Sequence, residues 1–274
     1  GSNTTNDQIT EIRLDGNDTG IEFNFGEIEP ASLSGHVCVA MPGFDCFSTE
    51  PNSISPLPGV KIDLVNAVGT VVATTFTLAN GSYRFNRLPA GVYSIVETQP
   101  ADLLDGLSRA GVINGLAVGI ASSGTRIAQI AIGGGQQGVN YDFCELSPAS
   151  LSGHVYQDDN NDGIRQNSEP RIPGATIRLF DSTGGLLGEI ATDSQGYYKF
   201  TGLRKGTYRI AEITPVEYLD GKDRVGQIAN KTVGQLDGTD AIKSIELPSG
   251  LNGENYDFGE ILPASISGNV YEDV

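Results

Sequence analysis

The amino-acid sequence repeats itself, and this repeat constrains the fold more than any other feature. The eight residues ProAlaSerLeuSerGlyHisVal occur at 30–37 and again at 148–155, and ProAlaSerIleSerGlyAsnVal occurs at 263–270. The similarity continues without a gap between 57–111 and 172–226, at a constant interval of 115 residues. A match of this length indicates tandem modules of one family.

A second repeated segment sets the module boundaries. Residues 20–27 are similar to 138–145 and to 253–260 at the end of each repeat. The natural protein is therefore expected to be longer than this chain. We predict four parts: the terminal strands of a preceding repeat at 1–28, module 1 at 29–146, module 2 at 147–261, and the first strand of a following repeat at 262–274.

Each module has the pattern of an all-β domain. Short alternating segments such as Ala175–Leu179 and Tyr197–Phe200 are separated by turns rich in Gly, Asn, Asp and Pro, which is typical of half-buried strands. About seven strands in about 115 residues is the size of an immunoglobulin-like or prealbumin-like sandwich. We therefore predict tandem β-sandwiches without long helices.

Residues 158–169 match the twelve-position calcium loop, with oxygen ligands at positions 1, 3, 5, 7, 9 and 12. Asp158, Asn160 and Asp162 would bind through side chains, Ile164 through its carbonyl, Gln166 directly or through water, and Glu169 through both carboxylate oxygens. Gly163 permits the sharp turn. The alternative is a solvated acidic turn. Because strands flank the loop, we expect Ca²⁺ to stabilise module 2, by roughly 1.4 kcal/mol at about 1 mM calcium for a dissociation constant of about 10⁻⁴ M.

Module 1 lacks this loop and contains all three cysteines, Cys38, Cys46 and Cys144. Cys46 falls near the position of Gly163, and Cys144 replaces Gly259, so we infer a Cys46–Cys144 disulfide. Its long loop would constrain the unfolded chain by roughly 4 to 5 kcal/mol, against about 2 to 3 kcal/mol for Cys38–Cys46. Cys38–Cys144 stays open as an alternative, as do three buried free thiols.

The formal net charge of −17 at pH 7 disfavours nucleic acid and anionic membrane surfaces as partners. No segment approaches the roughly 20 apolar residues that span a bilayer. A second calcium site is one account of the acid clusters Asp220, Asp223 and Asp237, Asp240; solvated loop charge is the simpler account.

The combination of repeated motifs resembles the B-type repeats of serine-aspartate repeat surface proteins, the SdrD B-like branch of the collagen-adhesin B (Cna B-type) superfamily. The motifs that carry the resemblance are the calcium loop with its preceding strand, GlyTyrTyrLysPhe at 196–200, ProAlaGlyValTyrSerIleValGluThrGlnPro at 89–100, and AsnTyrAspPheGlyGlu at 255–260. It implies an exported bacterial surface protein whose calcium-stabilised modules form a stalk.

The wider superfamily also includes domains with a Lys-to-Asn isopeptide bond assisted by a buried acid. That bond needs a Lys in the first strand, and neither 31–37 nor 149–155 contains one. Glu97 and Glu212 nevertheless share strand parity with core-facing residues, so both carboxyls should point inward. We expect them to be hydrogen-bonded and to have raised pKa values, because burial disfavours the charged form.

The leading functional interpretation is a spacer in an extracellular, cell-surface or cell-wall protein, with neighbouring repeats of the same chain as partners. The alternative is an adhesive module that binds a glycan or a partner protein through loops at one end of the sandwich. The chain has no Trp to form a sugar platform, which favours the spacer. We expect no enzyme, because the only histidines, His36 and His154, occupy one repeat position and no nucleophile elbow or phosphate loop occurs.

Overall fold

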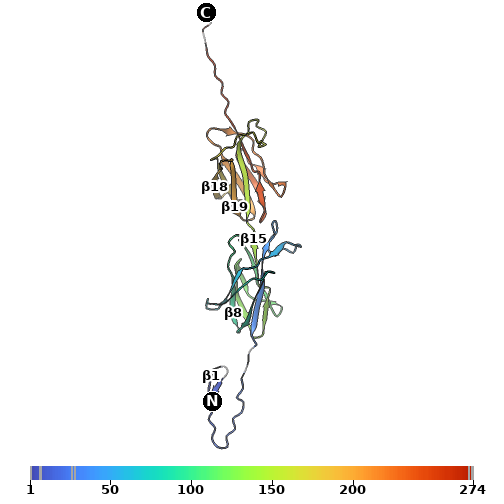
Figure 1. The fold of residues 1–274 in the computed structure, drawn as a ribbon, viewed down its shortest axis with the longest axis vertical. Coiled ribbons are helices and arrows are strands. Elements are labelled where there is room, and N and C mark those ends of the chain that lie inside the picture. The colour runs from blue at the N-terminus through green and yellow to red at the C-terminus, as the bar shows by residue number, and fades with distance from the viewer. Residues whose placement is uncertain (1, 6–7, 26, 28, 271, 273–274) are drawn as a thin grey trace.

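A computed structural model describes residues 2–5, 8–25, 27, 29–270 and 272 of the chain. These residues form strands, turns and loops, and no helix is found among them. Two β-sandwiches lie end to end along the long axis of the molecule (Figure 1). The predicted all-β class with tandem sandwiches is therefore confirmed.

Module 1 consists of two facing sheets. One sheet contains β3 (Ala31–Ala40), β4 (Ile54–Pro56), β7 (Ser82–Leu88), β9 (Leu104–Arg109), β10 (Val112–Ile113), β11 (Leu116–Ala117), β14 (Gln137–Val139) and β15 (Asp142–Leu146). The other has the strand order β12 (Ile120–Ser123), β13 (Arg126–Ile132), β8 (Gly91–Glu97), β5 (Lys61–Asn66) and β6 (Val71–Phe76).

Module 2 repeats this arrangement. Its first sheet contains β16 (Ala149–Gln157), β19 (Tyr197–Leu203), β21 (Leu219–Asp220), β22 (Gln227–Ile228), β23 (Lys231–Thr232), β26 (Asn252–Glu254) and β27 (Phe258–Ile261). Its second sheet has the order β18 (Leu186–Ala191), β17 (Thr176–Phe180), β20 (Gly206–Ile213), β25 (Ala241–Leu247) and β24 (Gln235–Leu236). In both modules the first strand pairs in parallel with the last, β3 with β15 and β16 with β27.

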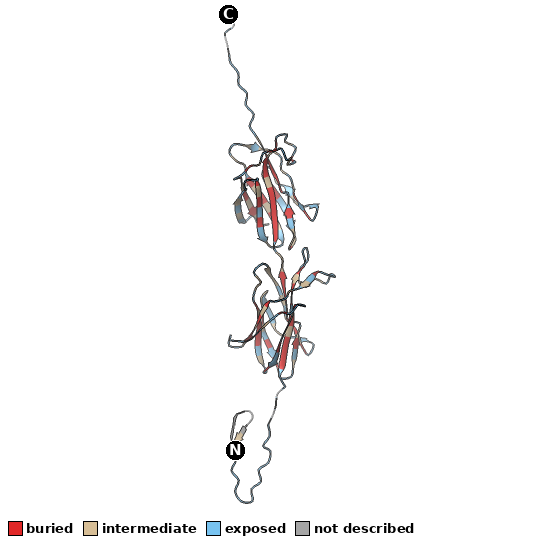
Figure 2. Cartoon of the chain, in the orientation of Figure 1, coloured by how far each residue is buried: buried red, intermediate tan, exposed pale blue. Residues whose placement is uncertain are grey.

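Each module buries its own core between its two sheets (Figure 2). Along β20 the side chains of Tyr208, Ile210 and Glu212 are buried and alternate with more exposed ones, which is the period of a strand with one face inward. The Tyr198 hydroxyl donates to the Tyr256 carbonyl at 2.6 Å, as Tyr83 does to Tyr141 in module 1.

The repeated SerGlyHis segment owes its glycine to this packing. A Cβ on Gly153 would lie 1.8 Å from the Tyr256 carbonyl oxygen, and one on Gly35 would lie 1.8 Å from that of Tyr141. The close approach of the first strand to the end of the domain therefore requires a residue without a side chain at this position in both modules.

The chain ends do not form the strands expected from the repeat. β1 (Ser2–Thr5) and β2 (Gln8–Thr10) pair with each other, whereas 20–25 and 263–270 contain no strand. A strand needs partners for its backbone groups, and neither segment joins a sheet of this chain. The rest of the predicted terminal segments, at 1, 6–7, 26, 28, 271 and 273–274, lies outside the described residues.

The joint between the modules is short. β15 ends at Leu146 and β16 begins at Ala149, so two residues separate the sandwiches. The Gly43 amide donates to the Ser249 carbonyl at 2.8 Å, and Arg204 Nη1 donates to the Asp105 carbonyl at 2.7 Å. Backbone groups of both modules thus take part in the contact.

Candidate functional site

The predicted calcium loop directly follows β16 and is closed at its base. The bridge between Tyr156 and Arg171 brings its two ends together, and the Asp158 amide donates to the Glu260 carbonyl at 2.7 Å. Because β16 and β27 run parallel, the loop lies at the end of module 2 from which the chain continues beyond Ile261. No flanking helix is present among the described residues around the loop, so it lacks the hinge of a helix-loop-helix sensor.

The acidic side chains of the loop fold inward around its backbone. Asp158 is fully buried, and its Oδ2 accepts from the Gly163 amide at 2.7 Å. Asp162 Oδ1 accepts from the Ile164 amide at 2.7 Å, while Asp162 Oδ2 accepts from the side chains of Asn160 and Gln166, each at 2.9 Å. The Asp162 carboxylate thus connects four of the six predicted ligand residues, itself included.

Glu169 closes the other end of the loop. It is 5% exposed, its Oε2 accepts from the Gln166 amide at 2.7 Å, and its Oε1 is buried without a hydrogen-bond partner. Gly163 adopts a φ of 75°, the left-handed conformation that the sharp turn requires. A buried orphan carboxylate oxygen among hard oxygen donors fits Ca²⁺.

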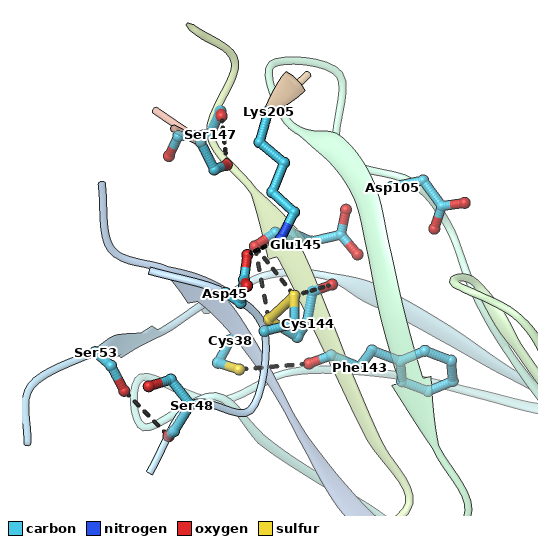
Figure 3. The surroundings of a disulfide bond; sticks show 12 residues. Cys38, Asp45, Ser48, Ser53, Asp105, Phe143, Cys144, Glu145, Ser147 and Lys205 are labelled. Atoms are coloured by element: carbon cyan, nitrogen blue, oxygen red, sulfur yellow. Dashed lines mark hydrogen bonds and ion pairs between the residues drawn. A yellow bond between two sulfur atoms is a disulfide. The ribbon is translucent and has the colours of Figure 1, made fainter. Parts of the chain in front are cut away.

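In module 1 a disulfide stands where module 2 has this loop. Cys46 and Cys144 are bonded with their Cα atoms 5.6 Å apart, and the loop that carries Cys46 is fixed against β15 (Figure 3). Cys38 is a buried free thiol that donates to the Phe143 carbonyl at 3.6 Å. Although Cys38 and Cys144 are register partners on parallel strands, the alternative Cys38–Cys144 bond does not form.

The two predicted buried acids each face a second carboxyl. Glu97 and Glu212 are 3% and 6% exposed, and Glu145 and Glu260 are fully buried beside them. Burial, followed by the charge of the partner, raises the pKa of Glu97 to about 9 and that of Glu212 to about 11. The hydrogen bond of each carboxyl is the one that it shares with its partner glutamate, Glu97 with Glu145 and Glu212 with Glu260; among the described groups no other donor reaches either carboxyl.

The partner glutamates are functional candidates that the sequence reasoning missed. Each comes from the last strand of its module, β15 or β27, whereas Glu97 and Glu212 come from β8 and β20 in the opposite sheet. The signal was available, because Glu145 and Glu260 are the final residues of the repeated segment that ends each module.

The acids considered for a second calcium site separate into two groups. Asp237 lies apart, paired with Arg209 at 2.9 Å and with Lys243 at 2.7 Å. Asp220 and Asp223 approach Asp240 near Glu212 and Glu260. The prediction that grouped Asp237 with Asp240 is therefore wrong, because the two side chains belong to different groups in the fold.

The part of the chain that the structure describes contains no helix long and apolar enough to cross a membrane. Among curated proteins, serine-aspartate repeat-containing protein F of Staphylococcus epidermidis is 32% identical over 171 residues, which are 62% of this chain and 10% of that protein. Serine-aspartate repeat-containing protein D of Staphylococcus aureus strain Newman is 31% identical over 162 residues, 59% of this chain and 12% of that protein. The chain thus spans about a tenth of the length of these relatives.

Among solved structures, the Bacillus anthracis TIE protein aligns with 86% of this chain and 35% of its own, at a TM-score of 0.33 and 17% identity. The shaft pilin SpaA of Lactobacillus rhamnosus GG aligns with 88% of this chain and all of its own, at a TM-score of 0.33 and 12% identity. Residues 49–146 and 149–260 each match the SdrD B-like domain. These two segments make up most of the chain, which therefore belongs to the family of SdrD B-like domains.

Proposed function

We propose that this chain is a spacer of a bacterial cell-surface protein, in which calcium stiffens module 2 and a disulfide stiffens module 1. The observation that carries the proposal is the two-residue joint, which sets the sandwiches end to end and leaves little chain for bending. The similarity to serine-aspartate repeat-containing proteins supports an extracellular location.

The disulfide-fixed loop supports the proposal because it lies at the joint. Lys205 of module 2 pairs with Asp45 at 2.5 Å beside Cys46, as Figure 3 shows. Since surface ion pairs contribute about 0 to 1 kcal/mol each, the pair mainly orients the modules. The calcium loop occupies the equivalent place at the far end of module 2, where the next repeat would follow. Calcium would then order the surface on which that repeat docks.

Thermal unfolding tests the calcium part of the proposal. Calcium at about 1 mM is expected to raise the midpoint of the module 2 transition relative to excess chelator, by a few degrees for a gain of roughly 1 to 2 kcal/mol. Asp162→Ala should reduce the shift, because it removes a ligand from the centre of the loop.

Asp159→Ala is the matched control, since Asp159 carries the same charge in the same loop but is not a ligand position. Calcium should still raise the midpoint in this variant. If calcium shifts no transition of the wild-type chain, the loop has no stabilising role, and the adhesive function becomes the leading interpretation.

Small-angle X-ray scattering tests the spacer part. The wild-type pair of modules is expected to give the maximum dimension of two sandwiches in line. Inserting a six-residue Gly-Ser linker between Ser147 and Pro148 should broaden the distance distribution toward shorter separations, because Gly-Ser linkers behave as flexible coils. Equal distributions for the two proteins would show that the natural joint is itself flexible.

A further inference from the structure

Module 2 contains a second group of converging carboxylates, separate from the calcium loop. Glu212 ends the buried face of β20, Glu260 lies on β27, and Asp240 lies in the turn between β24 and β25. One ligand oxygen of each lies within 4.8 Å of those of the other two. Three distant segments thus bring hard oxygen donors to one point in the interior.

These carboxylates lack the hydrogen bonds that buried acids normally have. Glu260 is fully buried and Glu212 is 6% exposed, and among the described groups the two carboxyls have no hydrogen-bond partner other than each other. Asp240 Oδ2 accepts from the Thr214 hydroxyl at 2.8 Å, but its Oδ1 is buried and unpartnered. The cluster therefore presents free oxygens to its own centre.

Two further acids extend the cluster toward the surface. Asp220 Oδ1 and Asp223 Oδ1 are also buried without a partner. Burial raises the pKa values of Glu212, Glu260, Asp220 and Asp223, and the charges of other cluster members raise them further, while the hydrogen bond with Glu212 lowers that of Glu260. Such a group is stable only when protons or a cation neutralise it.

A surface hollow borders the two outer acids of the cluster, Asp220 and Asp223. The hollow is lined by Asp220, Lys222 and Asp223 on one side and by Asp162 and Gly163 of the calcium loop on the other. An ion entering by this hollow would meet Asp220 and Asp223 before the deeper glutamates. An entry path is one of the features that a metal site requires.

Module 1 provides an internal comparison, because it keeps the glutamate pair and, as Asp105, the counterpart of Asp220, but not the other two acids. The Glu97 amide donates to the Thr125 carbonyl at 2.9 Å, as the Glu212 amide donates to that of Asp240 at 2.8 Å, so Thr125 occupies the place of Asp240. The repeat interval likewise aligns Ser108 with Asp223 and Gln99 with Thr214.

In module 1 the positions of Asp223 and Asp240 are neutral, and Gln99, at the position of Thr214, supplies a hydrogen-bond donor to the glutamate pair. The Gln99 side-chain amide donates to Glu145 Oε2, whereas the equivalent Glu260 in module 2 has only the hydrogen bond with Glu212. Module 1 has thus lost two acids of this cluster together with its calcium loop, and has gained an amide and a disulfide. The loss of the loop and of these acids in the same module is expected if both acidic sites of module 2 bind cations.

We propose that Glu212, Asp240 and Glu260 form a second, buried divalent-cation site in module 2, with Asp220 and Asp223 completing it on the solvent side. Calcium is the ion that fits, because it accepts six to eight oxygens in flexible geometry from an all-protein site, whereas magnesium keeps several waters. The site does not depend on the calcium loop for any of its ligands.

Counting bound calcium by isothermal titration calorimetry and equilibrium dialysis at pH 7.5 tests the proposal on the whole chain. The wild type should bind two ions, Asp162→Ala one, Asp240→Asn one, and the double variant none. Asparagine is chosen because it tolerates the left-handed φ of 56° at this position. Far-UV circular dichroism in chelator checks that each variant folds, and Glu260→Gln replaces Asp240→Asn if that variant does not.

Asp237→Asn is the matched control, because it removes a carboxylate from the same loop that is paired with Arg209 and Lys243. It should still bind two ions. If Asp162→Ala binds none, the cluster holds shared protons and the proposal is wrong. If the wild type binds one ion that Asp240→Asn removes, the second site stands and the calcium loop of the proposed function fails instead.

Discussion

At the scale of single residues, protonation stabilises the buried glutamate pair of module 1. Glu97 and Glu145 approach from opposite sheets, and the pKa of each is raised, chiefly by burial. Gln99 stabilises the charged form of Glu145 through its amide, so Glu97 is the member whose ionisation is most disfavoured. The pair therefore makes the stability of module 1 depend on pH.

The sign of this dependence follows from the raised pKa. Between the ordinary value of 4.5 and about 9, folded Glu97 keeps a proton that the unfolded chain has lost. Its contribution to the free energy of unfolding is therefore largest below pH 4.5 and is lost as pH rises toward 9. Glu97→Gln should raise the free energy of unfolding of module 1 at pH 8 by about 2 kcal/mol or more and flatten its slope.

Urea unfolding in chelator at pH 5 and pH 8 measures this effect. Glu50→Gln serves as the control, because Glu50 is an exposed acid of the same module. If the free energy of unfolding changes equally between pH 5 and pH 8 in the wild type and in Glu97→Gln, Glu97 is not protonated in the folded chain.

At the scale of elements, the loop after the first strand is where the two modules differ most. The disulfide joins residues 98 positions apart, which in the loop-entropy description constrains the unfolded chain by about 4 to 5 kcal/mol. Reduction should therefore lower the midpoint of the module 1 transition and leave that of module 2 unchanged. Differential scanning calorimetry with and without reductant measures both.

A Cys46→Ser, Cys144→Ser double variant should melt like the reduced wild type and not respond to reductant. If reductant lowers the midpoint of that variant, the effect of reduction does not come from the Cys46–Cys144 bond.

The calcium loop, the disulfide and the glutamate pair differ in how well the sequence predicts them, and the reasons are physical. The calcium loop is contiguous, so the spacing of Asp158 and Glu169 was readable along the chain. The disulfide required a choice among three thiols that strand register alone does not settle. The partnership of Glu97 with Glu145 was missed, because parity shows which way a side chain points but not which residue of the opposite sheet it meets.

At the scale of the whole molecule, the repeat period fixed the modules, and the last strands set how they join. Boundaries were predicted from repeated segments, and both cores lie within the predicted modules. The ends were less predictable, because 20–25 and 263–270 have the sequences of strands but find no sheet in this chain. Strand formation there depends on partners rather than on local sequence.

The parallel pairing of first and last strands has a consequence for a tether that is pulled from its two ends. The chain enters each sandwich through β3 or β16 and leaves through β15 or β27, so tension runs along strands that are bonded side by side. Their hydrogen bonds would be loaded together in shear rather than opened one after another. In module 1 the Cys46–Cys144 bond adds a covalent tie to the strand that bears this load.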